Sequence, residues 1–308
     1  MTPSGLSGEE RSSSSSGAVT SRALALVWFA DLCVSTASIF VRWSTAPSLV
    51  MAAYRKTFVT LMLLPVVLLR EDCRRELRSL DRRTLLWCVL SGTFLAIHFW
   101  TYFLSVNYTT VAASQVLVGT EVLFVALFMG LTGREHYGPW CRAGIFIAFL
   151  GSVLVTYAPG GIRGGMMFGN LCGIFSAAML SGYSLIGKKV RSGLSNTVYT
   201  FLVYGVSALV LNFMILFSPY SFTGYGTINY LTGLGMAVFC TLLGHSIFNW
   251  SFQYLSPTLV SITKLFQPMF SMVFALFLLG ELPRANQLLG GVVVILGIFL
   301  YIRHKPED

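Results

Sequence analysis

The chain has few charged residues and lacks the motifs that would mark an enzyme. Only 11% of its 308 residues are charged, 55% are hydrophobic and the mean hydropathy is +0.72, a composition that excludes a soluble globular protein. There is no H-E-x-x-H or G-x-S-x-G motif, no pair of aspartates in facing spans and no ATP-binding loop. The six cysteines lack C-x-x-C spacing, which predicts buried thiols rather than disulfides or a metal site. We therefore expect neither enzymatic activity nor a cofactor.

What the chain does contain is an internal repeat. At an ungapped offset of 146 positions, identical residues of several kinds coincide: Ser105 and Ser251, Tyr108 and Tyr254, Glu135 and Glu281, Gly144 and Gly290. Apolar composition alone would rarely align serine, glutamate and glycine together. If each copy holds five spans, the second copy is inserted upside down relative to the first. Such an inverted repeat allows one site to face each side of a membrane in turn, which favours a transporter.

Long apolar runs predict ten membrane-spanning helices of roughly 20 residues each. We place them at 23–44, 47–69, 84–104, 109–133, 140–158, 167–187, 198–218, 228–254, 257–280 and 284–303. The expected fold is therefore an all-α membrane protein, with ten transmembrane helices as a five-plus-five inverted repeat around a central cavity. The first repeat is expected at 23–158 and the second at 167–303. The polar segment 1–22 is predicted to be a disordered cytoplasmic tail.

Basic residues are distributed unevenly between the two sides of these predicted spans. With the N-terminus inside, 15 of the 21 lysines and arginines fall on the cytoplasmic side and three on the outer side. This asymmetry indicates that both termini are cytoplasmic. The net charge of +9 is therefore a topology signal and implies no nucleic-acid partner. The expected location is a bacterial inner membrane, with the lipid bilayer as partner and the protein either a monomer or a homodimer.

Ionisable residues inside apolar helices are costly, so each is a functional candidate. In the first span Asp31, Ser35 and Ser38 share one helical face. Arg55, in the second span, lies at a similar depth and is the expected partner of Asp31. A structural salt bridge and a contact with substrate are both open interpretations of these two residues.

The third and eighth spans each carry a histidine. His98 is four residues from Tyr102, and His245 is four residues from Asn249, which is followed by Trp250. Either histidine can be a hydrogen-bonded core residue, but two in corresponding spans favour a cavity lining. Histidine also titrates near physiological pH, which makes it a candidate carrier of a coupling proton.

The fourth and ninth spans form the predicted centre. Glu121 falls at mid-membrane with Gln115 on a flanking face, and Lys264 and Gln267 are followed by Pro268, which should break the ninth span. The repeat maps Glu121 onto Gln267, so we expect these two positions to face each other. A polar ligand site is one interpretation, and a structural Glu121–Lys264 pair is the other.

Several of these residues occur in recognisable motifs. They are Ala53-Tyr54-Arg55 in the second span, Asn249-Trp250 in the eighth, and Gln267-Pro268 and Gly280-Glu281 in the ninth. Across about 23–303, in two tandem copies, the chain resembles the EamA family of the drug/metabolite transporter superfamily. The resemblance implies a ten-helix fold and transport of small polar metabolites, often by export, with proton coupling or exchange. Gln267 and Lys264 depart from the family pattern, which has a glutamate before the proline, and indicate an anionic or zwitterionic substrate.

The expected function is secondary active transport of a small polar metabolite, amino-acid-like or anionic/zwitterionic, by alternating access. Export is the expected direction, and protons are the candidate coupling ion. The alternative is an importer or exchanger of a nucleotide-like or cofactor-like metabolite. The candidate residues for substrate binding or coupling are Asp31, Arg55, His98, Tyr102, Gln115, Glu121, Tyr183, His245, Asn249, Trp250, Lys264 and Gln267.

Overall fold

A computed structural model describes residues 7–132, 137–156, 164–282 and 284–304, and within these ranges every regular element is a helix. In chain order the helices are α1 (Ser7–Ser35), α2 (Ala37–Trp43), α3 (Ser48–Leu69), α4 (Glu71–Arg78), α5 (Arg82–Tyr108), α6 (Val111–Gly119), α7 (Glu121–Leu131), α8 (Pro139–Thr156), α9 (Gly164–Arg191), α10 (Asn196–Leu216), α11 (Gly226–Gly235), the π-helix η1 (Met236–His245), α12 (Ser246–Ser251), α13 (Pro257–Thr263), the 3-10 helix η2 (Lys264–Phe266), α14 (Gln267–Leu279) and α15 (Ala285–His304).

Helices occupy all ten ranges in which spans were predicted, but they differ in apolar length. Eight segments of the described chain are long and apolar enough to cross a membrane: 20–43, 48–69, 82–108, 111–131, 165–191, 196–216, 226–251 and 257–279. Helices α8 and α15 have shorter apolar runs, at 139–151 and 288–301. Helix α1 begins at Ser7, within the segment expected to be a tail, and α4 forms where the sequence shows a cluster of arginines.

Large apolar side chains cover the outside of the molecule as well as its interior. Leu69, Phe277 and Leu209 are among many that are mostly exposed, which in water would be an unusually large apolar surface. The largest buried cluster is formed by residues of α2, α3, α5, α9, α10 and η1. An apolar exterior around a helical interior is what a bilayer requires, because helices satisfy their own backbone hydrogen bonds.

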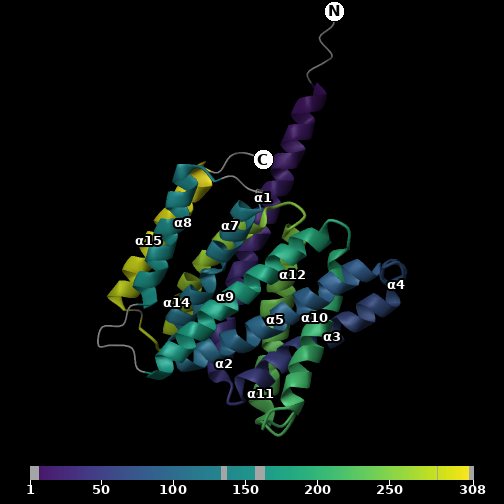
Figure 1. The fold of residues 1–308 in the computed structure, drawn as a ribbon, viewed down its shortest axis with the longest axis vertical. Coiled ribbons are helices and arrows are strands. Elements are labelled where there is room, and N and C mark those ends of the chain that lie inside the picture. The colour runs from purple at the N-terminus through teal and green to yellow at the C-terminus, as the bar shows by residue number, and fades with distance from the viewer. Residues whose placement is uncertain (1–6, 133–136, 157–163, 283, 305–308) are drawn as a thin grey trace, which may run out of the picture.

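Helices α8 and α15 pack against each other at one side of the molecule, at the left in Figure 1. Helices α5 and α9 pack against each other near the middle of the molecule. Glycines allow the α8–α15 backbones to approach closely. A Cβ atom on Gly297 would lie 2.4 Å from the Ala148 nitrogen, and one on Gly144 would lie 2.7 Å from the Gly297 carbonyl oxygen. Side chains therefore cannot be accommodated at these points.

The repeat is visible in the helix boundaries. Helices α6 and α13 begin 146 positions apart, as do α7 and α14, and α8 and α15. The caps correspond too, because Thr110 Oγ1 accepts from Ala113 N (3.1 Å) and Ser256 Oγ accepts from Leu259 N (3.3 Å). Such side-chain caps satisfy the free N–H groups that begin a helix. The corresponding helices α6 and α13 therefore begin with the same type of side-chain cap.

Candidate functional site

The site is organised by two interrupted helices, one in each copy of the repeat. In the second copy, the 3-10 turn η2 separates α13 from α14, and Pro268 lies in the first turn of α14, where a missing N–H is tolerated. In the first copy the break falls at Thr120 and involves no proline. There the Thr120 hydroxyl donates to the Leu117 carbonyl oxygen at 2.6 Å, a bond of the kind that bends helices.

Glu121, the first residue after the break in the first copy, forms a buried ion pair with Lys264. The Lys264 Nζ donates to both carboxylate oxygens, at 3.0 and 3.1 Å. Hydroxyl groups of Ser184 (2.6 Å) and Ser261 (3.3 Å) donate to Glu121 Oε1. Of the two interpretations left open by the sequence, the ion pair is therefore formed, and it leaves the carboxylate fully engaged.

Asp31 has a different partner from the one the sequence suggested. Its Oδ1 accepts from Gln267 Nε2 at 2.7 Å, whereas Arg55 Nε donates to Thr241 Oγ1 at 2.8 Å. The predicted Asp31–Arg55 salt bridge was wrong because similar depth does not fix which helices touch: α1 packs on α14, and α3 on η1. Glu121 and Gln267 are also not joined by a hydrogen bond within the described chain, since each is held by its own partner.

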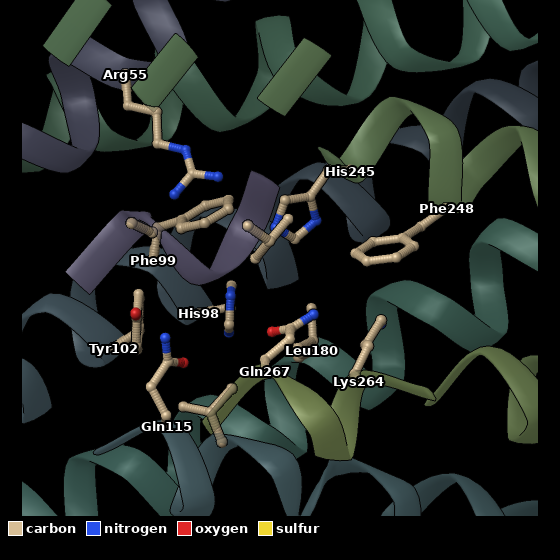
Figure 2. A pocket seen from close by; sticks show the side chains of 13 residues that line it. Arg55, His98, Phe99, Tyr102, Gln115, Leu180, His245, Phe248, Lys264 and Gln267 are labelled. Carbon is tan, nitrogen blue, oxygen red and sulfur yellow. The ribbon is translucent and has the colours of Figure 1, made fainter. Parts of the chain in front are cut away.

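A cavity lies between these helices near the interruptions. Seven of the predicted residues line it: Arg55, His98, Tyr102, Gln115, His245, Lys264 and Gln267. The sequence did not single out the apolar part of the wall, which is Val34, Ala37, Phe99, Val118, Leu180 and Phe248. Figure 2 shows the polar groups converging on this space from several helices. The volume in which the centre of a water molecule fits is about 20 Å³. This is enough for roughly one water, so the cavity is nearly closed.

The other five predicted residues lie behind the wall or away from it. Asp31 and Glu121 touch the wall through Gln267 and Lys264. The Tyr183 hydroxyl donates to Asn249 Oδ1 at 2.8 Å, forming a buried pair outside the lining. Trp250 lies 4.8 Å from the Tyr254 ring, between centroids, and is not part of the cavity. It follows Asn249 directly, so it points about 100° away around the helix.

The two histidines meet across the cavity. Their ring centroids are 6.4 Å apart, and His98 lies parallel to Tyr102 at 6.0 Å. His98 Nδ1 lies 3.2 Å from the Ser176 carbonyl oxygen. Ser176 Oγ lies nearer, 2.8 Å from Nδ1, and donates to the His98 carbonyl oxygen at 3.0 Å. A proton on Nδ1 of the neutral ring is compatible with all of these contacts, and Nε2 is then an acceptor.

The π-helix η1 positions the second histidine. The repeat aligns His98 with Gly244, one residue short of His245. Residues 236–245 form the π-helix that ends at His245, and its wider turn rotates the residues that follow around the axis. Such π turns are rare and are frequent at functional sites.

These features define a class: an integral membrane protein of long apolar helices that encloses a small polar cavity at two helix breaks. The family model of the EamA-like transporter family matches the chain twice, at residues 21–157 and 167–303. The chain belongs to this family.

Relatives and a solved structure agree with this assignment. An uncharacterized transporter of Archaeoglobus fulgidus is 26% identical over 68% of this chain and 73% of that protein. The uncharacterized transporter YyaM of Bacillus subtilis is 26% identical over 64% of this chain and 66% of that protein. A crystal structure of a protein 16% identical in sequence superposes with a TM-score of 0.69, covering 91% of this chain and 96% of that one. This last similarity concerns the fold alone.

Proposed function

We propose that this chain is a secondary active transporter that moves a small polar metabolite by alternating access and exports it. The observation that carries the proposal is the polar cavity at two helix breaks, one from each copy of the repeat. Interrupted helices at mid-membrane are a common way for carriers to build a substrate site. The proposed location is a bacterial inner membrane, with both termini cytoplasmic.

The proposal includes ten spans in a five-plus-five inverted repeat, with the copies at 23–158 and 167–303. Helices α8 and α15 contain 18 and 20 residues. At 1.5 Å per residue they are roughly 27 and 30 Å long, which matches the thickness of the hydrocarbon core. The two helices therefore have the length to complete each copy, although their apolar runs are shorter.

Contacts that correspond under the repeat support the inverted arrangement. Arg42 Nη2 donates to the Thr109 carbonyl oxygen at 3.0 Å, and Lys188 Nζ donates to that of Leu255 at 3.3 Å. Both the donors and the acceptors are 146 positions apart. The same cation-to-loop contact therefore forms in each copy, and in an inverted repeat one would lie at each membrane surface.

The cavity is closed toward one side by a layer of hydrogen bonds. A vestibule of about 250 Å³ is lined by Arg42, Ala112, Met272 and Glu281 among others. One helical turn deeper, Gln115 Nε2 donates to Ser271 Oγ at 2.6 Å, and Ser271 Oγ donates to the Ser35 carbonyl oxygen at 2.8 Å. We propose that parting of this layer opens the cavity to the vestibule, which is the outer side in the proposed topology.

The nearly closed cavity and its charges favour a small solute and a histidine as proton carrier. Glu121 is neutralised by Lys264, whereas His98 and His245 face the cavity. Uptake whose pH dependence survives replacement of both histidines by glutamine would contradict this coupling. Any of these solutes requires the cavity to widen, and a nucleotide-like solute requires more widening than a small one, so the exchanger stays the alternative.

Uptake into proteoliposomes tests the proposal. Purified protein is reconstituted, and labelled organic acids, amino acids and amines are offered with and without a pH gradient. We expect one class to accumulate above protein-free vesicles, and the His98→Gln variant to reduce its uptake. The Thr93→Val variant on the same helix is the control, because the Thr93 hydroxyl donates to the Val89 carbonyl oxygen of its own helix and the residue is partly exposed and outside the cavity lining. Absence of uptake for all classes would overturn the proposal.

A further inference from the structure

The charges on the cavity wall are all of one sign. Among the residues that line it, Arg55 and Lys264 are basic and none is acidic. The two nearby carboxylates lie behind the wall, with Asp31 bonded to Gln267 and Glu121 bonded to Lys264. Glu121 therefore neutralises one of the two cations on the wall, and Arg55 is left without a carboxylate partner.

Arg55 presents free donors toward this space. Its side chain is fully buried, and Nε alone is engaged, by Thr241. Within the residues that the structure describes, Nη1 and Nη2 have no hydrogen-bond partner, and the guanidinium carbon lies 4.1 Å from the centroid of the Phe99 ring. In Figure 2 the guanidinium points from α3 toward the space between Phe99 and His245. A guanidinium remains protonated in proteins, so this is a fixed charge with an unfilled fork of donors.

A second buried basic side chain, that of Lys56, lies near the Arg55 guanidinium. Lys56 is fully buried, and its Nζ lies 4.1 Å from the Phe99 centroid and 4.2 Å from that of Tyr204. This nitrogen also has no hydrogen-bond partner in the described part of the chain. Lys56 therefore places a second basic nitrogen over the same Phe99 ring as the Arg55 guanidinium.

We propose that the transported substrate is a small organic monocarboxylate that carries no ammonium group, and that Arg55 binds its carboxylate through Nη1 and Nη2. This inference rests on the proposed function and names its substrate class. Two parallel N–H groups match a carboxylate in a bidentate geometry. One negative charge on the substrate would pair with the Arg55 guanidinium, which has no carboxylate partner among the described residues. The apolar remainder of the substrate would lie against Phe99, Tyr102 and Phe248 of the wall.

An amino acid fits this wall less well than the corresponding acid. Its ammonium group would be removed from water and would need an anionic partner. Both oxygens of Glu121 already accept from Lys264. Asp31 lies behind Gln267, outside the lining, although its Oδ2 has no hydrogen-bond partner within the described residues. The charged groups on the wall itself therefore favour a carboxylate, and an amine would reach a carboxylate only if Gln267 moved away from Asp31.

Binding and transport are measured with matched probes on the full-length protein. The probes are propionate, butyrate and benzoate, the amino acids alanine and phenylalanine, the amines propylamine and benzylamine, and methyl phosphate. Thermal shift reports binding, and counterflow in proteoliposomes reports transport. We expect at least one carboxylate to bind and to exchange, and the amino acids, amines and methyl phosphate to do neither. Binding confined to methyl phosphate, or to amino acids or amines, overturns the carboxylate assignment, and so does the absence of binding by every probe.

Variants of Arg55 identify the receptor. Arg55→Met should weaken carboxylate binding roughly 10- to 100-fold, the range expected for charged hydrogen bonds, and Arg55→Lys should restore it only in part. Ligand-free Arg55→Met should melt at the same temperature or higher, because it removes an unpaired buried charge. Lys189→Gln, which removes a cation located over Trp87 at the end of α9, is the control with unchanged binding. Unchanged affinity in Arg55→Met overturns the inference.

The two proposals fail in different ways. Transport of amino acids or amines without carboxylates leaves the transporter proposal intact and overturns the substrate class. Binding of carboxylates that depends on Arg55, without counterflow of any probe, supports the anion site and contradicts the transport function.

Discussion

Replacing Lys264 by methionine removes the partner of a buried carboxylate without much change in side-chain length. Glu121 is 1% exposed and Lys264 5%, so the carboxylate would keep only the hydroxyl groups of Ser184 and Ser261 as donors. Leaving one member of a buried pair alone costs about 3–5 kcal/mol. We expect Glu121→Gln, which leaves the lysine alone, to cost a similar amount.

The double variant Glu121→Gln/Lys264→Met removes both charges together. Replacing a whole buried pair by neutral groups is often neutral in stability, so the double variant should lie within about 1 kcal/mol of the original protein. Thermal unfolding in detergent measures this. At about 2 °C per kcal/mol for a chain of this size, each single variant should melt roughly 6–10 °C lower and the double variant close to the original.

The exposed pair Arg75–Glu71 provides the matched control. Its atoms are 3.2 Å apart and its side chains about three-quarters exposed, so Arg75→Met should change stability by about 0.5 kcal/mol or less. If the double variant is as unstable as the two single variants, the ion pair is not the source of the effect and the reasoning is refuted. The double variant should also keep the pH dependence of transport, because the proposed function gives proton transfer to a histidine and Glu121 is paired with Lys264.

Three further outcomes are expected. Gly297→Leu should lower the free energy of unfolding by about 1–3 kcal/mol, and so lower the melting temperature, because the added Cβ would collide with α8. Gly205→Ala should leave the melting temperature unchanged, since the nearest atom to its Cβ is 3.6 Å away. Equal melting temperatures for the two variants would contradict the packing. In a background without native cysteines, Ser271→Ala should increase the labelling rate of Ala37→Cys by an impermeant thiol reagent several-fold, and an unchanged rate would remove Ser271 from the proposed closure. In intact cells the same reagent should label Ser221→Cys, and failure to do so would contradict the proposed orientation.

The sequence predicted the positions of the helices and the main polar positions, but not how these positions are paired. Hydropathy locates helices because a bilayer imposes a length and an apolar surface on each one. Pro268 marked the break in the second copy, whereas the break at Thr120 had no such marker, since a threonine hydroxyl bends a helix only in some contexts. Periodicity places Asp31 on a face, but it does not state that the face meets α14 rather than α3.

The apolar wall of the cavity could not be found from the sequence for a related reason. In a chain that is 55% hydrophobic, Phe99 and Phe248 look like any other lipid-facing or core phenylalanine. Their role depends on neighbours brought in from distant helices, including the cation of Arg55 over Phe99. His245 was found because histidine is rare in spans, although the π-helix that turns it toward His98 leaves no recognisable pattern of residues.

The glycine contacts between α8 and α15 bear on the balance between the two orientations of a carrier of the proposed kind. The repeat exchanges the Gly144–Gly297 approach with that of Gly290 and Gly151, where a Cβ on Gly151 would lie 2.8 Å from the Gly290 carbonyl oxygen. Two contacts that are counterparts of each other exchange roles when the two copies exchange conformations, so their contributions cancel from the equilibrium between the outward and inward states. The Glu121–Lys264 pair has no such counterpart, because the repeat places Gln267 and Val118 at the corresponding positions. The resting orientation of the carrier is then set by its few unmatched contacts, and only a ligand that treats the two states differently can shift it.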